Sequence, residues 1–335
     1  MHFILLIWSV VFLSGFRNND DLKPIQLSGN AQGTTFHIIY YAEDSLVTKG
    51  QINRLLNEVD SSLSLYKPYS LISEFNRSAD GLVVDQHFLK IFNKSREIYQ
   101  ETKGSFDITV KPLVSAWGFG VKSTKSSPDT ATIRNLLACV GTDKLHLTGN
   151  YLRKEKACVE IDLNGIAQGY TVDLIAAFIE SKGIGNYLVE LGGEIRVKGR
   201  KRPSGELMSI GIESPAENEF DLTSVKKTIQ IETGAVTTSG NYRKFKQLGN
   251  KRISHLIDPT SGYPFETDLI SVTVYAKDAI SADGYDNALM GMGLEKALLF
   301  VEKKKDLEAY FIYRKADDTI ADTATAGFYK LIKED

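Results

Sequence analysis

Residues 157–199, "ACVEIDLNGIAQGYTVDLIAAFIESKGIGNYLVELGGEIRVKG", carry the pattern that decides the fold. A β-rich run ends at Asp162, and a turn through Gly165 and Gly169 follows it. A helix is then expected to about residue 182, where a glycine stops it, and a strand resumes over residues 187–191. The stretch therefore predicts strand, tight turn, helix, turn and strand.

The flanking segments add helices and strands without regular alternation. Apolar residues at helical spacing predict helices over 49–62 and 86–102, and a further helix is expected after Asp283. Runs of β-branched and aromatic residues predict strands at 32–41, 209–214, 226–232 and 269–276. This order is typical of the α+β class, with mixed sheets and flanking helices, more than of a doubly wound sheet. No Pro/Gly linker interrupts residues 28–335, which we interpret as a single domain.

Composition excludes some classes of partner. The 335 residues are 42% hydrophobic and 24% charged, as in ordinary soluble globular proteins. The formal net charge is -2, so no basic surplus exists to hold a phosphate backbone. We therefore expect no nucleic-acid partner.

Residues 1–20, "MHFILLIWSVVFLSGFRNND", stand apart from the rest. An apolar run over 3–13 is followed by small and then polar residues, which is the order of a signal peptide, and it is too short to span a bilayer comfortably. The basic n-region is missing, so a buried first strand is the alternative. Phe16 stands where a lipoprotein would have its lipid-bearing cysteine. We expect an exported protein, periplasmic or membrane-associated, without a lipid anchor.

Two cysteines are present, Cys139 and Cys158, and they form no CxxC pair. A structural zinc or dithiol redox site is therefore not indicated. In an exported protein they could form one disulfide, and two buried thiols are the alternative.

Four segments hold more polar or glycine residues than packing requires. Residues 104–120, "GSFDITVKPLVSAWGFG", predict either a β-edge plugged by aromatic side chains or a wall for a flat heterocycle beside Asp107. Residues 162–173, "DLNGIAQGYTVD", place free backbone N–H groups at a helix start, which favours phosphate, although the glycine spacing is not that of a Rossmann motif. Gly192 and Gly193 allow a bend or a close backbone approach to a ligand. His255, shortly before Asp258, is a general-base candidate.

A fifth segment is "SADGYDNALMGMG", residues 281–293. On a helix, Asp283, Asp286 and Asn287 share one face and could direct oxygens to one point. Hard divalent cations take such ligands. The alternative is that Asp283 only caps the helix and Asp286 suits its positive end.

Read in order, these segments resemble the ApbE family of FAD:protein FMN transferases. The matching stretches run from about residue 30 to 300 and are "GTTFHIIY", "LSLYKPYSLISEFNR", "GSFDITVKPLVSAWGFG", "DLNGIAQGYTVD", "LVELGGEIRVKG", "TSGNYRKF", "SHLIDPTSGYP" and "SVTVYAKDAISADGYDNALMGMG". The resemblance implies an ApbE-like, T-fold-related architecture. It also implies cleavage of FAD and transfer of FMN to a Thr or Ser of an acceptor redox subunit, with release of AMP. Magnesium is the implied ion, with manganese as the alternative, and FAD is the substrate.

The resemblance also implies roles for single residues. Asp283 looks like the principal metal ligand, with Asp286 beside it, the carbonyl of Gly165 opposite, and Asn287 where the family usually has Thr. His255 is the expected acceptor-side base, and Asp258 is expected to hold it or its loop. The expected FAD contacts are Gln32, Tyr66, Ser105, Phe106, Asp107, Asp162, Gln168 and Ile257.

Alternative functions remain open. A magnesium-dependent FAD pyrophosphatase would release FMN and AMP, whereas Tyr66 resembles the transferase branch. A flavin-binding protein without catalysis is favoured by Asn287 and by Gln168, which replaces a usual Lys or Glu. Self-flavinylation at Thr237 is a further hypothesis, and association with the inner membrane is left open.

Overall fold

The computed structural model describes residues 22–120, 127–214, 225–241, 245–248 and 251–333. The proposed signal segment, residues 1–20, lies outside the described residues. Among the described helices, none combines the length and the apolar character needed to cross a membrane.

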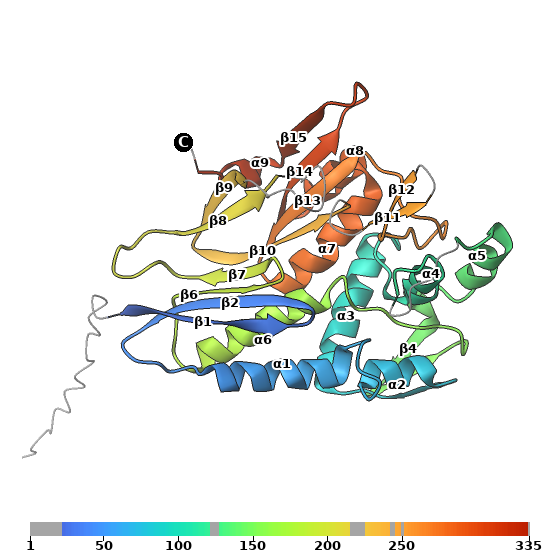
Figure 1. Ribbon diagram of the computed structural model, residues 1–335, viewed down its shortest axis with the longest axis horizontal. Coiled ribbons are helices and arrows are strands. Elements are labelled where there is room, and N and C mark those ends of the chain that lie inside the picture. Colours follow the sequence, from blue (N-terminus) through green and yellow to red (C-terminus); the bar gives the residue numbers. More distant parts are fainter. Residues whose placement is uncertain (1–21, 121–126, 215–224, 242–244, 249–250, 334–335) are drawn as a thin grey trace, which may run out of the picture.

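The centre of the fold is an eight-stranded sheet whose neighbouring strands are all antiparallel (Figure 1). In spatial order the strands are β1 (Lys23–Ala31), β2 (Thr34–Ala42), β6 (Tyr187–Leu191), β7 (Glu194–Lys198), β10 (Thr233–Gly240), β13 (Leu269–Ala276), β14 (Leu307–Arg314) and β15 (Ile320–Ala324). Within the described ranges, three small sheets accompany it: β3 (Gly81–Val83), β5 (Tyr151–Lys154) and β4 (Leu145–Thr148); β8 (Met208–Glu213) and β9 (Val225–Ile231); β11 (Phe245–Leu248) and β12 (Lys251–Ser254).

The helices are α1 (Lys49–Leu63), α2 (Leu71–Arg77), α3 (Gln86–Glu101), α4 (Lys111–Ala116), α5 (Thr130–Leu137), α6 (Ala167–Ser181), α7 (Ala279–Met292), α8 (Leu294–Val301) and α9 (Ala326–Tyr329). The α+β prediction is confirmed. The helix of the opening stretch is α6, which ends just before Gly183, and the strand at 187–191 is β6.

The large sheet is buried on both faces, as β13 shows. Its Val272 and Val274 join the apolar cluster that includes residues of α3 and α7. Ile270 joins the cluster that includes β8 and β9, because the register shift between Leu269 and Ser271 turns it to the opposite face. A strand covered on both sides reads as a continuous apolar run, which is why "LISVTVYA" is visible in the sequence.

Helices α6 and α7 approach closely at Gly169. A Cβ added there would lie 2.3 Å from the carbonyl oxygen of Ala279 and 2.7 Å from the Cβ of Asp283. Both are fixed parts of α7, so only glycine allows this approach. The contact brings the start of α6 against the first turns of α7, where the predicted metal ligands lie.

The expected strand ending at Asp162 is wrong, because no strand is assigned there. The side chain of Asn76 takes the place of a neighbouring strand: its Nδ2 donates to the Ile161 carbonyl at 2.9 Å, and its Oδ1 accepts from the Ile161 N–H at 2.7 Å. The segment is therefore extended and hydrogen-bonded without joining a sheet.

Residues 104–120 do not form the β-edge that was one alternative. They form a short 3₁₀ turn over Ile108–Val110 and then α4, which has Pro112 in its first turn. Proline is tolerated there because the first N–H groups of a helix lack partners in any case.

Asp283 is not a helix cap. Helix α7 begins at Ala279, and Asp278 caps it by accepting from the Ser281 N–H. Asp283 therefore lies within the helix, and the cap that was an alternative to a ligand role belongs to another residue.

Candidate active site

Asp283 and Asp286 are buried carboxylates on α7, with only 3% and 2% of their surfaces exposed. Burial raises the pKa of both, since the charged forms lose water. The charge of Asp283 raises the pKa of Asp286 further. The N–H of Gly169 donates to Asp283 at 2.8 Å and lowers its pKa, whereas the charge of Asp173 raises it. Two such carboxylates require a positively charged or donating group beside them.

Asn287 supplies donors at this point. Its Nδ2 donates to the Gly165 carbonyl at 3.3 Å, to the Asp283 carbonyl at 3.0 Å and to Asp286 Oδ1 at 2.9 Å. Its Oδ1 accepts from the Ser239 hydroxyl on β10 at 3.3 Å. The structure therefore brings together all four predicted metal-site residues, with an amide N–H₂ group between their oxygens.

The site contains no larger acidic or histidine cluster. Among the residues that the structure describes, no three His, Cys, Asp or Glu side chains are grouped so as to hold a metal ion. A cation here would be held by two carboxylates together with carbonyl and amide oxygens, which suits a hard ion that also binds ligand oxygens.

The free N–H groups expected at the start of α6 are largely engaged. The N–H groups of Ile166 and Ala167 donate to the Leu163 carbonyl, and that of Gly169 donates to Asp283. In this structure the Gly169 N–H at the helix start positions the Asp283 carboxylate, and the predicted contact of this helix start with phosphate stays a prediction.

Asp173 and Arg196 fix the helix pair and were missed by the sequence reading. Asp173 accepts from the N–H groups of Ala279 and Ile280 at 3.0 and 2.9 Å, and Arg196 of β7 pairs with it at 2.7 Å. Burial raises the pKa of Asp173, and the charge of Arg196 opposes this shift. Asp173 ends the segment that the sequence singled out, but nothing local identifies its partners.

Gln32 and Gln168 lie around the first turns of α6. Gln32, in the β1–β2 turn with φ 50°, donates through Nε2 to the Thr171 hydroxyl at 3.0 Å. A Cβ at Gly192 would lie 2.7 Å from Gln168 Nε2, so the β6–β7 turn closes on that side chain. Gln32 also lines a surface hollow of about 480 Å³ formed by residues 30–35. Their predicted FAD contacts stay predictions.

The segment 105–108 meets Asp162, whose N–H donates to the Ile108 carbonyl at 2.7 Å. Ser105 is half-buried and Phe106 is buried. The buried carboxylate of Asp107 accepts from Thr109 and from Thr142, each through both backbone and side chain. Asp107 thus organises its own loop in this structure, and its contact with FAD stays a prediction.

His255 and Ile257 lie against the α4–α5 region. The ring of His255 contacts Phe119 edge-on, with ring centroids 6.4 Å apart, and Ile257 is buried among the residues around Trp117. Asp258 Oδ1 accepts from the Thr260 N–H at 2.8 Å. Asp258 therefore makes a hydrogen bond within its own loop, and its expected role in holding His255 or the loop for catalysis stays a prediction.

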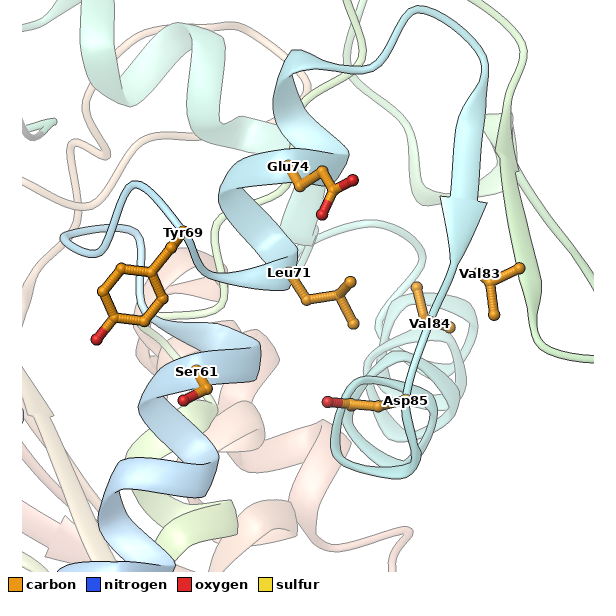
Figure 2. Close-up of a pocket in the computed structure, with 7 residues that line it drawn as sticks. All are labelled: Ser61, Tyr69, Leu71, Glu74, Val83, Val84 and Asp85. Atoms are coloured by element: carbon orange, nitrogen blue, oxygen red, sulfur yellow. The ribbon is translucent and has the colours of Figure 1, made fainter.

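Tyr66 is 66% exposed, three residues before Tyr69. Tyr69 borders a hollow of about 400 Å³ between α1, α2 and the start of α3 (Figure 2). No predicted site residue lines this hollow. Thr237 is fully buried on β10, so self-flavinylation there does not agree with the structure.

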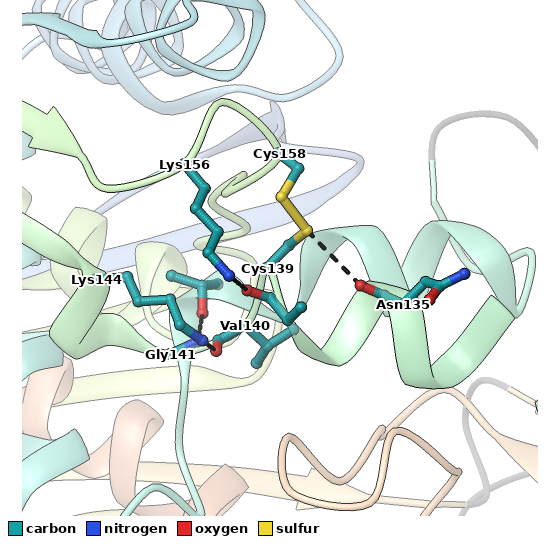
Figure 3. The surroundings of a disulfide bond; sticks show 9 residues. Asn135, Cys139, Val140, Gly141, Lys144, Lys156 and Cys158 are labelled. Carbon is teal, nitrogen blue, oxygen red and sulfur yellow. Dashed lines mark hydrogen bonds between the residues drawn. A yellow bond between two sulfur atoms is a disulfide. The ribbon is translucent and has the colours of Figure 1, made fainter. Parts of the chain in front are cut away.

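Cys139 and Cys158 form a disulfide with a Cα–Cα distance of 5.5 Å (Figure 3). The disulfide alternative is therefore confirmed. Beside it, Lys156 Nζ donates to the Ala138 carbonyl at 3.2 Å. The bond ties the residues after α5 to the segment that leads to Asp162.

The sequence of residues 32–311 matches the model of the ApbE family. The chain belongs to the ApbE family. The resemblance drawn from eight sequence segments is thus confirmed, and the match spans the strands and helices that surround the carboxylate pair of this ApbE-family protein.

Curated relatives are similar over most of their length. An FAD:protein FMN transferase of Vibrio cholerae is 34% identical over 334 residues, 98% of each chain. One from Escherichia coli K12 is 34% identical over 283 residues, 82% of this chain and 79% of the relative. Among solved structures, a flavin transferase ApbE from Vibrio cholerae has a TM-score of 0.82 at 34% identity and covers 92% of this chain and 99% of its own. An apo flavinyl transferase ApbE of Pseudomonas stutzeri has a TM-score of 0.83 at 31% identity, covering 92% and 97%.

Proposed function

We propose that this protein is an FAD:protein FMN transferase that requires magnesium. It would cleave the pyrophosphate of FAD, transfer FMN to a Thr or Ser hydroxyl of an acceptor redox subunit, and release AMP. The observation that carries the proposal is the buried pair Asp283 and Asp286 beside the contact of α6 with α7, where the Asn287 amide links Asp286 to the Gly165 carbonyl. Membership of the ApbE family, with close relatives named for this activity, supports it.

The donor set fits a hard cation. Asp283, Asp286, Gly165 and Asn287 offer only oxygen ligands once the amide is turned. The N–H₂ group of Asn287 already donates to two of these oxygens, the Gly165 carbonyl and the Asp286 carboxylate, where a cation would be attracted. When bound, magnesium would neutralise charge on the pyrophosphate. Manganese is the alternative ion.

The chain's own residues then have distinct tasks. The oxygen of the acceptor hydroxyl forms a bond to the phosphorus on the FMN side, the bond from that phosphorus to the bridging oxygen breaks, and AMP leaves with that oxygen. His255 would take the hydroxyl proton, since a neutral imidazole ring carries one nitrogen that can accept it. The loop held by Asp258 and packed against Phe119 positions that ring. The buried surroundings of Asp283 and Asp286 would exclude water from the metal side.

The test is incubation with FAD, Mg²⁺ and a Thr-containing acceptor, with covalent flavin fluorescence and AMP measured in parallel. We expect equal amounts of adduct and AMP, and at least a 100-fold loss in Asp283→Asn, because removing a ligand should exceed the roughly 10 to 100-fold cost of losing an outer partner. FMN and AMP without adduct would identify a pyrophosphatase. FAD binding without turnover would identify a flavin-binding protein.

We further propose that the protein acts outside the cytoplasm, exported by its N-terminal apolar segment and retained near the inner membrane. The Cys139–Cys158 disulfide supports an oxidising compartment. Fractionation of cells that express the full chain, with mass analysis of its N-terminus, tests this; a cytoplasmic protein with an intact N-terminus would contradict it.

A further inference from the structure

The side chain of Asn287 is held at both ends of its amide. Its Nδ2 faces the carbonyls of Gly165 and Asp283 and the carboxylate of Asp286, and its Oδ1 accepts from Ser239. Backbone carbonyls only accept hydrogen bonds, so two of the three inward neighbours require a donor. The nitrogen-inward orientation is therefore set by the chemistry of the surroundings.

That orientation conflicts with a cation at the same oxygens. An N–H₂ group directed at them would be repelled by a cation, whereas the amide oxygen of the same side chain is a suitable ligand. A half-turn of the amide exchanges the two ends without moving α7. The half-turn breaks the hydrogen bonds that Nδ2 donates, and one of them joins the turn at Gly165 to α7.

Ser239 can accompany either orientation. A hydroxyl both donates and accepts, so Ser239 Oγ can donate to Oδ1 as observed or accept from Nδ2 after the half-turn. It lies on β10 opposite Val272 of β13, and only 9% of its surface is exposed. Its oxygen is therefore fixed, and only its proton must rotate.

We propose that Asn287, positioned by Ser239, has two settings: nitrogen inward as a clamp between α6 and α7 without metal, and oxygen inward as a ligand when a divalent cation binds. The inference rests on the magnesium site proposed above. In this proposal, a bound cation replaces the hydrogen bonds that Asn287 Nδ2 donates and gains Asn287 Oδ1 as a ligand.

The test measures Mg²⁺ binding calorimetrically on the FAD-free protein, and its melting temperature with and without Mg²⁺. Asn287→Leu removes clamp and ligand, so the metal-free melting temperature should fall and Mg²⁺ affinity should drop by about 10-fold or more. Asn287→Asp fixes an oxygen inward. Without metal this variant should melt at a lower temperature than wild type, but it should bind Mg²⁺ more tightly, and Mg²⁺ should raise its melting temperature by more. If Asn287→Asp does not fold, Asn287→Thr decides, because its hydroxyl can donate or coordinate and should bind Mg²⁺ more tightly than Asn287→Leu.

Ser239→Ala is the second variant. Because the hydroxyl pairs with both settings, its loss should lower the melting temperature similarly with and without Mg²⁺ and leave the affinity within about threefold. A large gain in affinity would mean that Ser239 serves only the metal-free setting, contrary to the proposal. Mg²⁺ binding by Asn287→Leu as tight as wild type would overturn the ligand role of Asn287 alone. Failure of the wild type to bind Mg²⁺ would overturn the magnesium site itself.

Discussion

Two regions of the molecule are built in different ways. The helix pair, α6 and α7, packs on the large sheet within extensive apolar clusters. The side module, formed by α4, α5 and the loop 255–264, lies at one end of the molecule (Figure 1) and rests on a small cluster of Leu113, Trp117, Ile133, Val140 and Ile257. A disulfide and a few hydrogen bonds complete the side module. We infer that the proposed metal binding at the helix pair and the proposed proton transfer at the side module can be perturbed separately.

The largest expected effect is on the helix pair. Gly169→Ala places a Cβ 2.3 Å from the Ala279 carbonyl oxygen, which belongs to a packed helix and cannot yield without separating α6 from α7. We expect the free energy of unfolding to fall by more than about 3 kcal/mol. Mg²⁺ affinity should fall as well, because Gly165 and Asp283 move apart.

Urea denaturation measures the stability, and Gly185→Ala is the matched control. Gly185 has no atom within 4 Å of the added Cβ, so its change should stay within about 0.5 kcal/mol. Equal effects of the two substitutions would show that close helix packing does not hold the site.

The next effect concerns the disulfide of the side module. Replacing Cys139 and Cys158 together with serine opens a loop with a sequence separation of 19, which should cost about 2 to 3 kcal/mol. Hydrogen exchange should rise in α4, α5 and residues 157–163, while Mg²⁺ affinity stays unchanged. A loss of Mg²⁺ binding equal to the loss of stability would contradict the separation of the two regions.

Trp117→Phe tests the same module on a smaller scale. Trp117 Nε1 donates to the Gly262 carbonyl at 2.8 Å, and the substitution leaves that buried oxygen without its donor. We expect a cost of about 1 to 2 kcal/mol. Flavin transfer should slow because the His255 loop loosens, while Mg²⁺ affinity is kept.

The control for Trp117→Phe is Tyr263→Phe. The rings of Tyr263 and Trp117 are in contact, with centroids 5.9 Å apart. The Tyr263 hydroxyl lies near Thr130 at the exposed surface. Stability should change by less than about 0.5 kcal/mol. This variant keeps the ring that packs on Trp117 and removes only the hydroxyl, so a slowed transfer equal to that of Trp117→Phe would show that loss of the Gly262 hydrogen bond is not what slows the reaction.

The two regions also differ in what the sequence reveals. The helix pair and the sheet leave periodic signals: the strand at 187–191 and the run at 269–276 coincide with β6 and β13. The segment before Asp162 is wrongly predicted as a strand, because its backbone pairs with the side chain of Asn76. That residue lies 85 positions away from Ile161, so no local sequence pattern indicates the contact.

The candidate site divides in the same manner. The spacing of Asp283, Asp286 and Asn287 on one helix face is local information, and the structure keeps it. Other contacts of the site depend on tertiary packing, which sequence spacing cannot reveal. These are the approach of Gly165, the hydrogen bond from Ser239 to Asn287 and the Asp173–Arg196 ion pair. A cap at Asp283 was plausible from spacing, but Asp278 stands closer to the true start of α7.

The smallest expected effect lies on the outer side of the helix pair, at Glu101. It pairs with Lys304 at 2.7 Å and accepts from the Tyr285 hydroxyl of α7. Burial pushes the pKa of Glu101 up, but the hydrogen bonds from Lys304 and Tyr285 outweigh it and hold the pKa below its ordinary value of 4.5. A depressed pKa means that the stabilisation is present above 4.5 and is lost as the pH falls through the lower, folded-state value.

Glu101→Gln should therefore lower the free energy of unfolding by less than about 1 kcal/mol at neutral pH, because the pair is partly exposed and screened. The difference from wild type should shrink as the pH falls below 4.5. Denaturation of both proteins across this range checks it, and a difference that grows in acid would reverse the sign of the argument. Because Glu101, the last residue of α3, joins the segment after α8 to Tyr285 on the side of α7 away from Asp283 and Asp286, Mg²⁺ affinity should stay at the wild-type value. An altered affinity would mean that the outer face of α7 also sets the position of its carboxylates.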